Sequence, residues 1–380
     1  MALQQSGWVM YKREDIIMDF VKQQRTVWQS LRETKKPVVL YGMGDGAEKI
    51  LKVCAQKNIT ISDIFASDEY VRGHSFAGFR VKRLSEILET YEDFVIVVCF
   101  AVHDDGMLTR LYDLDKRYEL YAPDVPVAGE GLFDDTYVKE HEAELTEVYA
   151  LLQDDSSRQV LQQLIDYKLT GRIELLKACT TQKSQAMRQI IRPNPNEHYV
   201  DLGAYDGDTI RELLGYTDGE FAHITALEPD PKNFRKLQLK LEQQLTPSDR
   251  TRISAYNLLA HKTRDTLHFD SRAGRNSSLS SSTARSVAKE ADSVDNLLRG
   301  CDTPVSLIKF DVEGAEYDAL LGCAQTIKKD APRLIVSAYH RNEDLFALPR
   351  LIKQLNPAYR IYLRKHPYIP AWDINLYVTT

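Results

Sequence analysis

Two segments of the chain share an uncommon order, in which a short apolar run enters a glycine turn and continues into a helical pattern. One spans residues 37–46 (Pro-Val-Val-Leu-Tyr-Gly-Met-Gly-Asp-Gly) and the other spans residues 198–203 (His-Tyr-Val-Asp-Leu-Gly). This order predicts a buried strand that opens a β-turn-α unit. Because 380 residues exceed what a single hydrophobic core usually holds, we expect two α/β domains, each built on one of these units.

Strand and helix patterns alternate around the first unit. Apolar runs at 59–66 and 94–100 flank a helical pattern at 84–90, and an amphipathic helix is predicted at 8–34. Such alternation is typical of a parallel sheet covered by helices. The predicted organisation is a smaller Rossmann-like domain over 1–133, a helical connector without strand patterns over 134–192 and a larger α/β domain over 193–380.

The larger domain is predicted to hold a parallel sheet that ends in a hairpin. Its last two apolar runs, 359–364 and 375–379, are joined by a stretch too short for a crossover helix, so they should pair antiparallel. The preceding strand candidates, mostly separated by helical patterns, are 199–202, 224–227, 253–257, 306–310 and 333–338. The short serine cluster at 277–282 is predicted to be a loop.

The composition excludes several classes of protein. Lys and Arg number 49 against 55 Asp and Glu, a net charge of -6 without the concentrated positive field that nucleic-acid binding needs. The five cysteines show no C-x-x-C spacing, so neither a disulfide framework nor a zinc site is indicated. No run approaches the ~18 apolar residues of a membrane span, and the amino terminus lacks a signal-type apolar core. We therefore expect a cytoplasmic protein with no nucleic-acid partner.

The turn of the second unit begins with a carboxylate, which is unusual for a phosphate-binding loop. Asp201 ends the strand, Gly203 follows it, and Asp208 and Thr209 stand where the helix begins. Acidic side chains beside exposed backbone amides suit a ligand that carries both cationic groups and a carboxylate. Gly203 would let such a ligand approach the backbone. The alternative is an ordinary tight turn in which Asp208 or Thr209 caps the helix.

A second acidic strand end follows one β-α unit later, in Leu-Glu-Pro-Asp at 227–230. A carboxylate at the position of Glu228 can accept hydrogen bonds from both ribose hydroxyls of a nucleoside. The alternative is a solvated acid before a helix that Pro229 begins. Together the two acidic ends predict a site for S-adenosylmethionine, a nucleoside with an ammonium, a sulfonium and a carboxylate.

Two further strand ends supply candidate catalytic residues. Asp311 and Glu313 follow the apolar run Ile-Lys-Phe, and His340 follows Val-Ser-Ala-Tyr. Since the carboxyl ends of parallel strands open into one crevice, we predict that these side chains face a substrate. Asp311, Glu313 or His340 could remove the acceptor proton, and we rank His340 first, with Asp311 and Glu313 orienting the acceptor. The alternative is that the two carboxylates hold a divalent cation that acidifies the hydroxyl. Glu316 is explained equally well by the dipole of the helix that follows.

Taken together, these motifs resemble those of FkbM-type methyltransferases, over about 154–380. The motifs are Tyr199–Thr209, Ala226–Asp230, Asn276–Ser278, Lys309–Glu316 and Ser337–His340. The resemblance implies a class I methyltransferase fold, with a Rossmann-like seven-stranded sheet and a terminal antiparallel hairpin. It also implies O-methylation from S-adenosylmethionine, commonly on a sugar, glycan or secondary-metabolite hydroxyl.

The resemblance also carries over a set of pocket residues. Tyr205 stands where many relatives have Asn, so a side-chain amide contact is not carried over, and Tyr205 could cover the cofactor instead. Asn276 and Ser278 are carried over as pocket residues, although a polar loop explains them equally well. The implied cofactor-binding residues are Asp201, Gly203, Ala204, Tyr205, Asp208, Thr209, Glu228 and Pro229.

The turn of the first domain has a motif of its own. Gly42, Gly44 and Ala47 satisfy the G-x-G-x-x-A pattern, Gly46 adds a third glycine, and Asp68 lies near the end of the next strand. The pattern is also found in domains without a known ligand. Residues 36–123 resemble the nucleotide-binding-like amino-terminal modules of sugar-modifying enzymes. This resemblance leaves two roles open, binding of the nucleotide of an acceptor and a role in assembly alone. Two rival hypotheses are an NAD-dependent oxidoreductase or epimerase acting here, and a non-catalytic nucleotide-binding scaffold.

Overall fold

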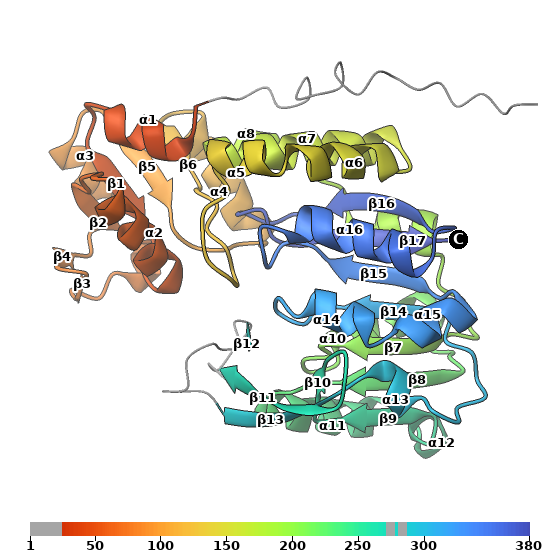
Figure 1. Ribbon diagram of the computed structural model, residues 1–380. Helices are drawn as coiled ribbons and strands as arrows, with labels where there is room; N and C mark the ends of the chain where they lie inside the picture. Colours follow the sequence, from red (N-terminus) through yellow and green to blue (C-terminus); the bar gives the residue numbers. More distant parts are fainter. Residues whose placement is uncertain (1–24, 271–277, 280–286) are drawn as a thin grey trace, which may run out of the picture.

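Two sheets, one of four strands and one of seven, form the framework of the chain (Figure 1). This computed structural model describes residues 25–270, 278–279 and 287–380. The predicted α/β class is confirmed. Of the helix expected at 8–34, residues 8–24 lie outside the described part, and Val27–Glu33 forms α1, which begins at a capping box on Thr26. Within the described residues, every helix is too short or too polar to cross a bilayer.

The first sheet has the strand order β2-β1-β5-β6 and is parallel throughout. Every residue of β1 and β5 is buried, as expected of parallel strands with helices on both faces. Of the strand predicted at 59–66, only residues 63–65 form a strand, β2. The strands are β1 (Val38–Tyr41), β2 (Asp63–Phe65), β5 (Val95–Val98) and β6 (Glu119–Tyr121), and the helices are α2 (Asp45–Gln56), α3 (Leu84–Thr90) and α4 (Asp105–Asp115). A 3-10 turn, η1 (Asp68–Tyr70), and a small hairpin, β3 (Ser75–Phe76) and β4 (Phe79–Arg80), follow β2.

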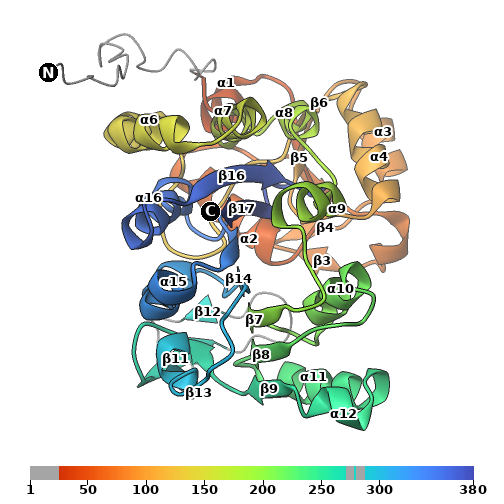
Figure 2. The same ribbon diagram turned by 90° about the vertical axis from the view of Figure 1, so that its right-hand side faces the viewer.

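The seven-stranded sheet has the order β16-β17-β15-β14-β7-β8-β9. The predicted hairpin is confirmed, since β17 pairs antiparallel with both β15 and β16. Figure 2 shows α15 and α16 on one face and α9, α10 and α11 on the other. The strands of the seven-stranded sheet are β7 (His198–Leu202), β8 (His223–Leu227), β9 (Ile253–Tyr256), β14 (Leu307–Phe310), β15 (Arg333–Ser337), β16 (Arg360–Lys365) and β17 (Ile374–Thr379). Its helices are α10 (Asp208–Tyr216), α11 (Pro231–Gln244), α12 (Pro247–Arg250), α13 (Val294–Leu297), α14 (Glu316–Leu321), α15 (Ala324–Asp330) and α16 (Asp344–Leu355).

The connection from β9 to β14 differs from the expected helical segment. It contains a small sheet of order β10-β13-β11-β12, made of β10 (Leu259–Ala260), β11 (Asp265–Asp270), β12 (Ser278–Leu279) and β13 (Val287–Asp292). β11 and β13 carry charged residues at several positions, so they lack the apolar run of a buried strand. The loop predicted at 277–282 is wrong for Ser278 and Leu279, which pair with β11. The other residues of that cluster, and Asn276, lie outside the described part.

Helices fill the segment between the two sheets. α6, α7 and α8 run along the β16 edge of the seven-stranded sheet in both views (Figures 1 and 2). A single apolar cluster continues from the first sheet through these helices into the second sheet, so the two halves share a core. The helices are α5 (Asp135–Glu140), α6 (Glu142–Leu151), α7 (Asp155–Thr170), α8 (Ile173–Ala178), α9 (Lys183–Ala186) and the π-helical turn η2 (Met187–Ile191).

Helix α7 is bonded to a different half of the chain at each end. At its start, Ser157 Oγ accepts the N–H of Leu363 in β16 at 3.0 Å. At its end, Tyr167 Oη donates to the carbonyl of Ala122 at 2.6 Å, just after β6. Beside it, Lys168 Nζ lies 2.5 Å from Asp124 Oδ2, with both side chains almost fully buried. These contacts fix the position of the first sheet relative to the second.

The buried Lys168–Asp124 pair gives a stability prediction. Asp124→Asn should lower the free energy of unfolding by about 3–5 kcal/mol, because it leaves the Lys168 ammonium buried without its partner charge. Urea denaturation followed by circular dichroism measures the change. The control is Lys116→Met, which removes an exposed pair with Asp113 and should cost less than about 1 kcal/mol. If Asp124→Asn and Lys116→Met lower the free energy of unfolding by the same amount, the buried pair does not hold the two halves together.

Candidate active site

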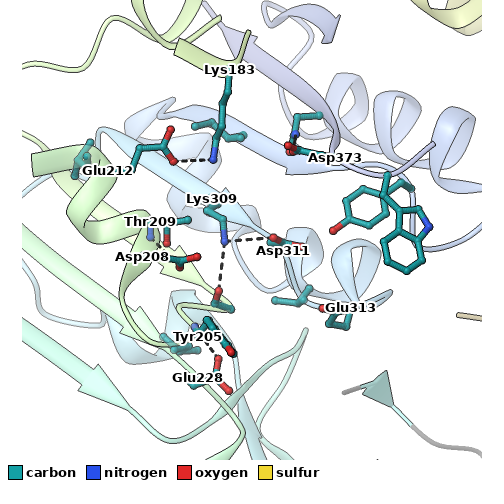
Figure 3. Close-up of a pocket in the computed structure, with 18 of the residues that line it drawn as sticks. Lys183, Tyr205, Asp208, Thr209, Glu212, Glu228, Lys309, Asp311, Glu313 and Asp373 are labelled. Carbon is teal, nitrogen blue, oxygen red and sulfur yellow. Dashed lines mark hydrogen bonds and ion pairs between the residues drawn. The ribbon is translucent and has the colours of Figure 1, made fainter. Parts of the chain in front are cut away.

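A cavity of about 510 Å³ opens at the carboxyl ends of β7, β8, β14 and β15 (Figure 3). This volume is within the range of small-molecule sites. Six of the eight predicted cofactor residues line it: Gly203, Tyr205, Asp208, Thr209, Glu228 and Pro229. Asp201 and Ala204 are fully buried behind the wall. The structure thus brings the two acidic strand ends to one place, as the sequence predicts.

Asp201 and Lys309 form a buried pair beneath the cavity. They face each other directly in the register of β7 and β14, and Lys309 Nζ lies 3.4 Å from Asp201 Oδ1. Lys309 Nζ also donates to the carbonyl of Gly203 at 3.3 Å and lies 3.7 Å from Asp311 Oδ2 (Figure 3). Burial lowers the pKa of Lys309, but Asp201 and Asp311 outweigh burial and raise it overall. Lys309 therefore remains an ammonium that holds both strand ends.

Thr209 binds this pair and does not cap its helix. Its Oγ1 donates to Asp201 Oδ2 at 2.5 Å, and α10 begins after Gly207 without a side-chain cap. Burial raises the pKa of Asp201, while Lys309 and Thr209 oppose that rise. The capping alternative for Asp208 and Thr209 is therefore wrong.

Gly203 is required for a reason other than the predicted one. Its φ is +83°, and a Cβ placed on it would lie 1.9 Å from the carbonyl oxygen of Asp311. The chain after β14 thus occupies the place of a side chain at Gly203. Ala204 is likewise a packing residue, because its methyl group lies in the apolar cluster on the α10 side of the sheet.

Glu228 is held by the backbone on both of its oxygens. The N–H of Tyr205 donates to Oε2 at 2.9 Å, and the N–H of Asp230 donates to Oε1 at 2.8 Å. Burial raises the pKa of Glu228 to about 7, although these two N–H groups lower it. Tyr205 adopts a left-handed φ of +47°, which directs its N–H at Glu228. The two acidic motifs are therefore linked directly.

The four groups at the ends of β14 and β15 form one cluster. His340 Nδ1 lies 2.9 Å from Glu316 Oε1, and His340 Nε2 lies 3.4 Å from Glu313 Oε2 and 3.7 Å from Asp311 Oδ1. Asp311 and Glu313 line the cavity with about a third of each side chain exposed. Burial raises the pKa of Glu313, whereas Lys309 and His340 outweigh burial and lower the pKa of Asp311.

The predicted role of His340 as the base is not supported by its position. Its side chain is completely buried and does not line the cavity. Burial opposes a charge on the imidazole, but Glu316 and Glu313 outweigh burial and raise the pKa of His340 well above its usual value. Ala128, which follows the first sheet, donates its N–H to the carbonyl of His340 at 2.8 Å and helps to cover this corner. His340 therefore keeps its proton and faces carboxylates.

Sequence reasoning missed several residues of this site. Lys309 could have been found from the strand alternation, because a lysine inside Ile-Lys-Phe-Asp lies on the same face as Asp311. For Glu316 the sequence leaves a helix-dipole role and a functional role open, and the structure shows it fully buried against His340. No pattern in the sequence indicates the aromatic rings of Tyr339, Tyr368 and Trp372, which line the cavity from the turn after β15 and from the β16–β17 connection. His103, from the first half, stacks on Tyr368 with 5.3 Å between ring centroids.

The glycine turn of the first domain does not line this cavity. A Cβ on Gly46 would lie 2.3 Å from the carbonyl oxygen of Cys99, and a Cβ on Gly42 would lie 2.6 Å from the ring of Phe100. Packing of α2 against the end of β5 thus accounts for two of the three glycines. Asp68 begins η1, directly after β2. Nucleotide binding by Gly42, Gly44, Gly46 and Asp68 stays a prediction.

Comparison with known proteins agrees with this geometry. Residues 201–369 match the model of the methyltransferase FkbM domain. A solved structure of an FkbM methyltransferase from Methylobacillus flagellatus KT is 22% identical, covers 92% of this chain and 92% of its own, and superposes with a TM-score of 0.71. That likeness extends across both halves and shows a common fold.

Other solved structures are much less similar. A putative rRNA methylase from Clostridium thermocellum is 10% identical over 51% of this chain and 91% of its own, with a TM-score of 0.33. A putative methyltransferase from Streptococcus mutans, solved with SAH, is 12% identical over 51% of this chain and 93% of its own, with a TM-score of 0.32. No curated protein matches the sequence. From the family match and the position of its motifs, the chain carries a methyltransferase domain of the FkbM family over residues 201–369.

Proposed function

We propose that this protein is an S-adenosylmethionine-dependent O-methyltransferase whose acceptor is a hydroxyl of a sugar or glycan. The observation that carries the proposal is the Glu228 carboxylate, which is held by two backbone N–H groups at the edge of a cavity that also contains the Asp311 strand end. A carboxylate oxygen accepts more than one hydrogen bond. Glu228 can therefore bind the ribose hydroxyls of the cofactor and keep both of its backbone partners.

The other cavity residues suit the rest of the cofactor. Lys183 and the first N–H groups of α10 favour the carboxylate of the methionine part. Asp208 supplies negative charge on the same wall, which favours the ammonium and the sulfonium. The bound cofactor would supply an activated methyl group, so the protein mainly has to align an acceptor oxygen with it.

The aromatic side of the cavity supports a sugar acceptor. The Trp372 ring is stacked on the Tyr339 ring, with 6.4 Å between the ring centroids, and its centroid lies 5.7 Å from that of the tilted Tyr368 ring. Such rings offer flat apolar surfaces to the C–H faces of a sugar, while Asp105 and Asp373 on the same rim can accept hydroxyl hydrogen bonds. The first half of the chain contributes to this rim, which supports its participation in acceptor binding, including that of a nucleotide sugar.

Glu313 is the group we assign to the acceptor proton. It lines the cavity between the cofactor wall and the aromatic rings, whereas His340 lies behind it. Asp311 is tied to Lys309 and orients the acceptor. Incubating the protein with labelled S-adenosylmethionine and a panel of saccharides and nucleotide sugars tests the whole proposal. If no saccharide or nucleotide sugar in the panel gains label on a hydroxyl, the proposed sugar or glycan acceptor is contradicted.

Replacement of Glu228 should weaken cofactor binding. Glu228→Gln removes the charge that accepts the ribose hydrogen bonds, at a cost of about 1–3 kcal/mol of binding free energy. Titration calorimetry with S-adenosylhomocysteine measures it as a loss of about 5- to 150-fold in affinity. Glu220→Gln, on the loop before β8, is the control and should bind normally. Normal binding by Glu228→Gln would refute the ribose assignment.

Cofactor binding should also depend on pH. The ribose hydroxyls bind the ionised carboxylate best, so bound ligand lowers the pKa of Glu228 from its value of about 7 in the free protein. Affinity for S-adenosylhomocysteine should therefore be constant above pH 8 and fall below pH 7, by at most about tenfold per pH unit. The same calorimetry from pH 6 to 8.5 measures this. The slope should be absent in Glu228→Gln.

Replacement of Glu313 should slow methyl transfer without loss of the cofactor. Glu313→Gln keeps the shape of the side chain but cannot accept a proton, so kcat should fall about 10²- to 10⁴-fold. Affinity for S-adenosylhomocysteine should change by less than about threefold, since Glu228 and the α10 turn are untouched. Steady-state assays with the acceptor found in the labelling screen provide kcat. An unchanged kcat would assign proton removal to another group or to water.

A further inference from the structure

The cluster behind the cavity brings three ligand-type side chains together from separate elements. Asp311 follows β14, Glu316 begins α14 and His340 follows β15. One ligand atom from each of the three lies within 4.8 Å of the other two. Glu316 and His340 are completely buried, while Asp311 also reaches the cavity. Of these three residues only Asp311 lines the cavity, so a ligand would reach the cluster from the cavity.

Several polar atoms of this cluster have no hydrogen-bond partner among the described residues. They are Asp311 Oδ1, Glu316 Oε2, His340 Nδ1 and His340 Nε2. A buried polar atom left without a partner costs about 1–3 kcal/mol, so four in one place need an explanation. The charged neighbours lie at ion-pair distance from the imidazole but not in hydrogen-bond geometry. The unpartnered atoms belong to the same three residues that the spacing brings together.

The separations within the cluster are those of ligands around one ion. Two ligands bonded to a divalent ion at about 2.1 Å are separated by about 3.0–3.4 Å in octahedral or tetrahedral geometry. His340 Nε2 lies 3.4 Å from Glu313 Oε2 and 3.7 Å from Asp311 Oδ1. Glu316 Oε1 lies 2.9 Å from the other ring nitrogen, Nδ1. One ion binds one nitrogen of the ring, so the imidazole or the Glu316 side chain has to turn until the same nitrogen faces both Asp311 and Glu316. Carboxylates alone would suit Mg²⁺ or Ca²⁺, but an imidazole favours a transition metal.

We propose that Asp311, Glu316 and His340 bind a divalent transition-metal ion of the Mn²⁺ or Zn²⁺ class, with Glu313 beside its open side. The ion takes the place of the imidazole proton, which leaves to solvent as the ion binds. The carboxylates of Asp311, Glu313 and Glu316 surround the imidazole of His340, so their negative charges compensate the positive charge of the ion. On the proposed function, the ion lies on the acceptor side of the cavity and binds the hydroxyl oxygen, which favours loss of the hydroxyl proton.

Manganese binding to the full-length protein tests this inference. After chelator treatment, the protein is titrated with Mn²⁺, and free ion is followed by electron paramagnetic resonance. We expect one ion per chain and, in electron spin echo spectra, modulation from a coordinated imidazole nitrogen. His340→Asn and Glu316→Gln should each weaken binding at least tenfold, and His340→Asn should remove the nitrogen modulation. A competing titration with Zn²⁺ should displace Mn²⁺ from the same site.

The controls separate a lost site from a lost fold. Asp318→Asn removes a carboxylate from the same helix, α14, but one paired with Lys262 outside the cluster, and should bind Mn²⁺ normally. Asp311→Asn is a third, less buried ligand variant. Each variant is also titrated with S-adenosylhomocysteine, which depends on Glu228 and not on this cluster. Ligand variants that bind S-adenosylhomocysteine but lose Mn²⁺ support the inference.

Two outcomes would overturn the inference. One is S-adenosylhomocysteine binding by the wild-type protein without Mn²⁺ or Zn²⁺ binding, which would leave the proposed function intact and make the cluster a protonated histidine among carboxylates. The other is Mn²⁺ binding that His340→Asn and Glu316→Gln do not change. Failure of the proposed function is distinguishable, because there Mn²⁺ would bind with the nitrogen signature while S-adenosylhomocysteine would not bind at all.

Discussion

The Lys309 ammonium is the interaction on which the candidate site depends. It is buried, and its neighbours are Asp201, the carbonyl of Gly203 and Asp311. Asp201 in turn accepts from Thr209 at the start of α10. One positive charge therefore fixes the turn after β7, the turn after β14 and the first residues of a helix. Such a charge is costly to bury alone. Of the two carboxylates that neutralise it, Asp201 is buried beneath the cavity and Asp311 lines it.

Helix α7 has the same importance at the scale of the whole chain. Without a stiff element bonded at both ends, two sheets separated by a connector would be expected to move relative to each other. Here Ser157 binds β16, and Tyr167 and Lys168 bind the chain that leaves the first sheet. That same chain continues to Ala128, which covers His340. The corner of the cavity beside His340 is thus built partly from residues that precede residue 201.

The sequence was sufficient for features that repeat along the chain, and insufficient for features that depend on contacts between distant segments. Buried strands, the terminal hairpin and the meeting of Asp201, Glu228 and Asp311 follow from apolar runs and from the common direction of parallel strands. The small sheet after β9 was missed because two of its strands are only two residues long and charged residues interrupt the other two. The burial of His340 was missed because Glu316 and Ala128, which enclose it, come from other elements.

The mixed origin of the cavity has a consequence for how proteins of this architecture can diversify. The turns after β7 and β8 line one side of the cavity, whereas His103, Asp105 and Val127 reach the cavity from the amino-terminal half. Exchange of that half, or of the few loop positions it contributes, could change which molecule is modified while the donor pocket keeps its residues.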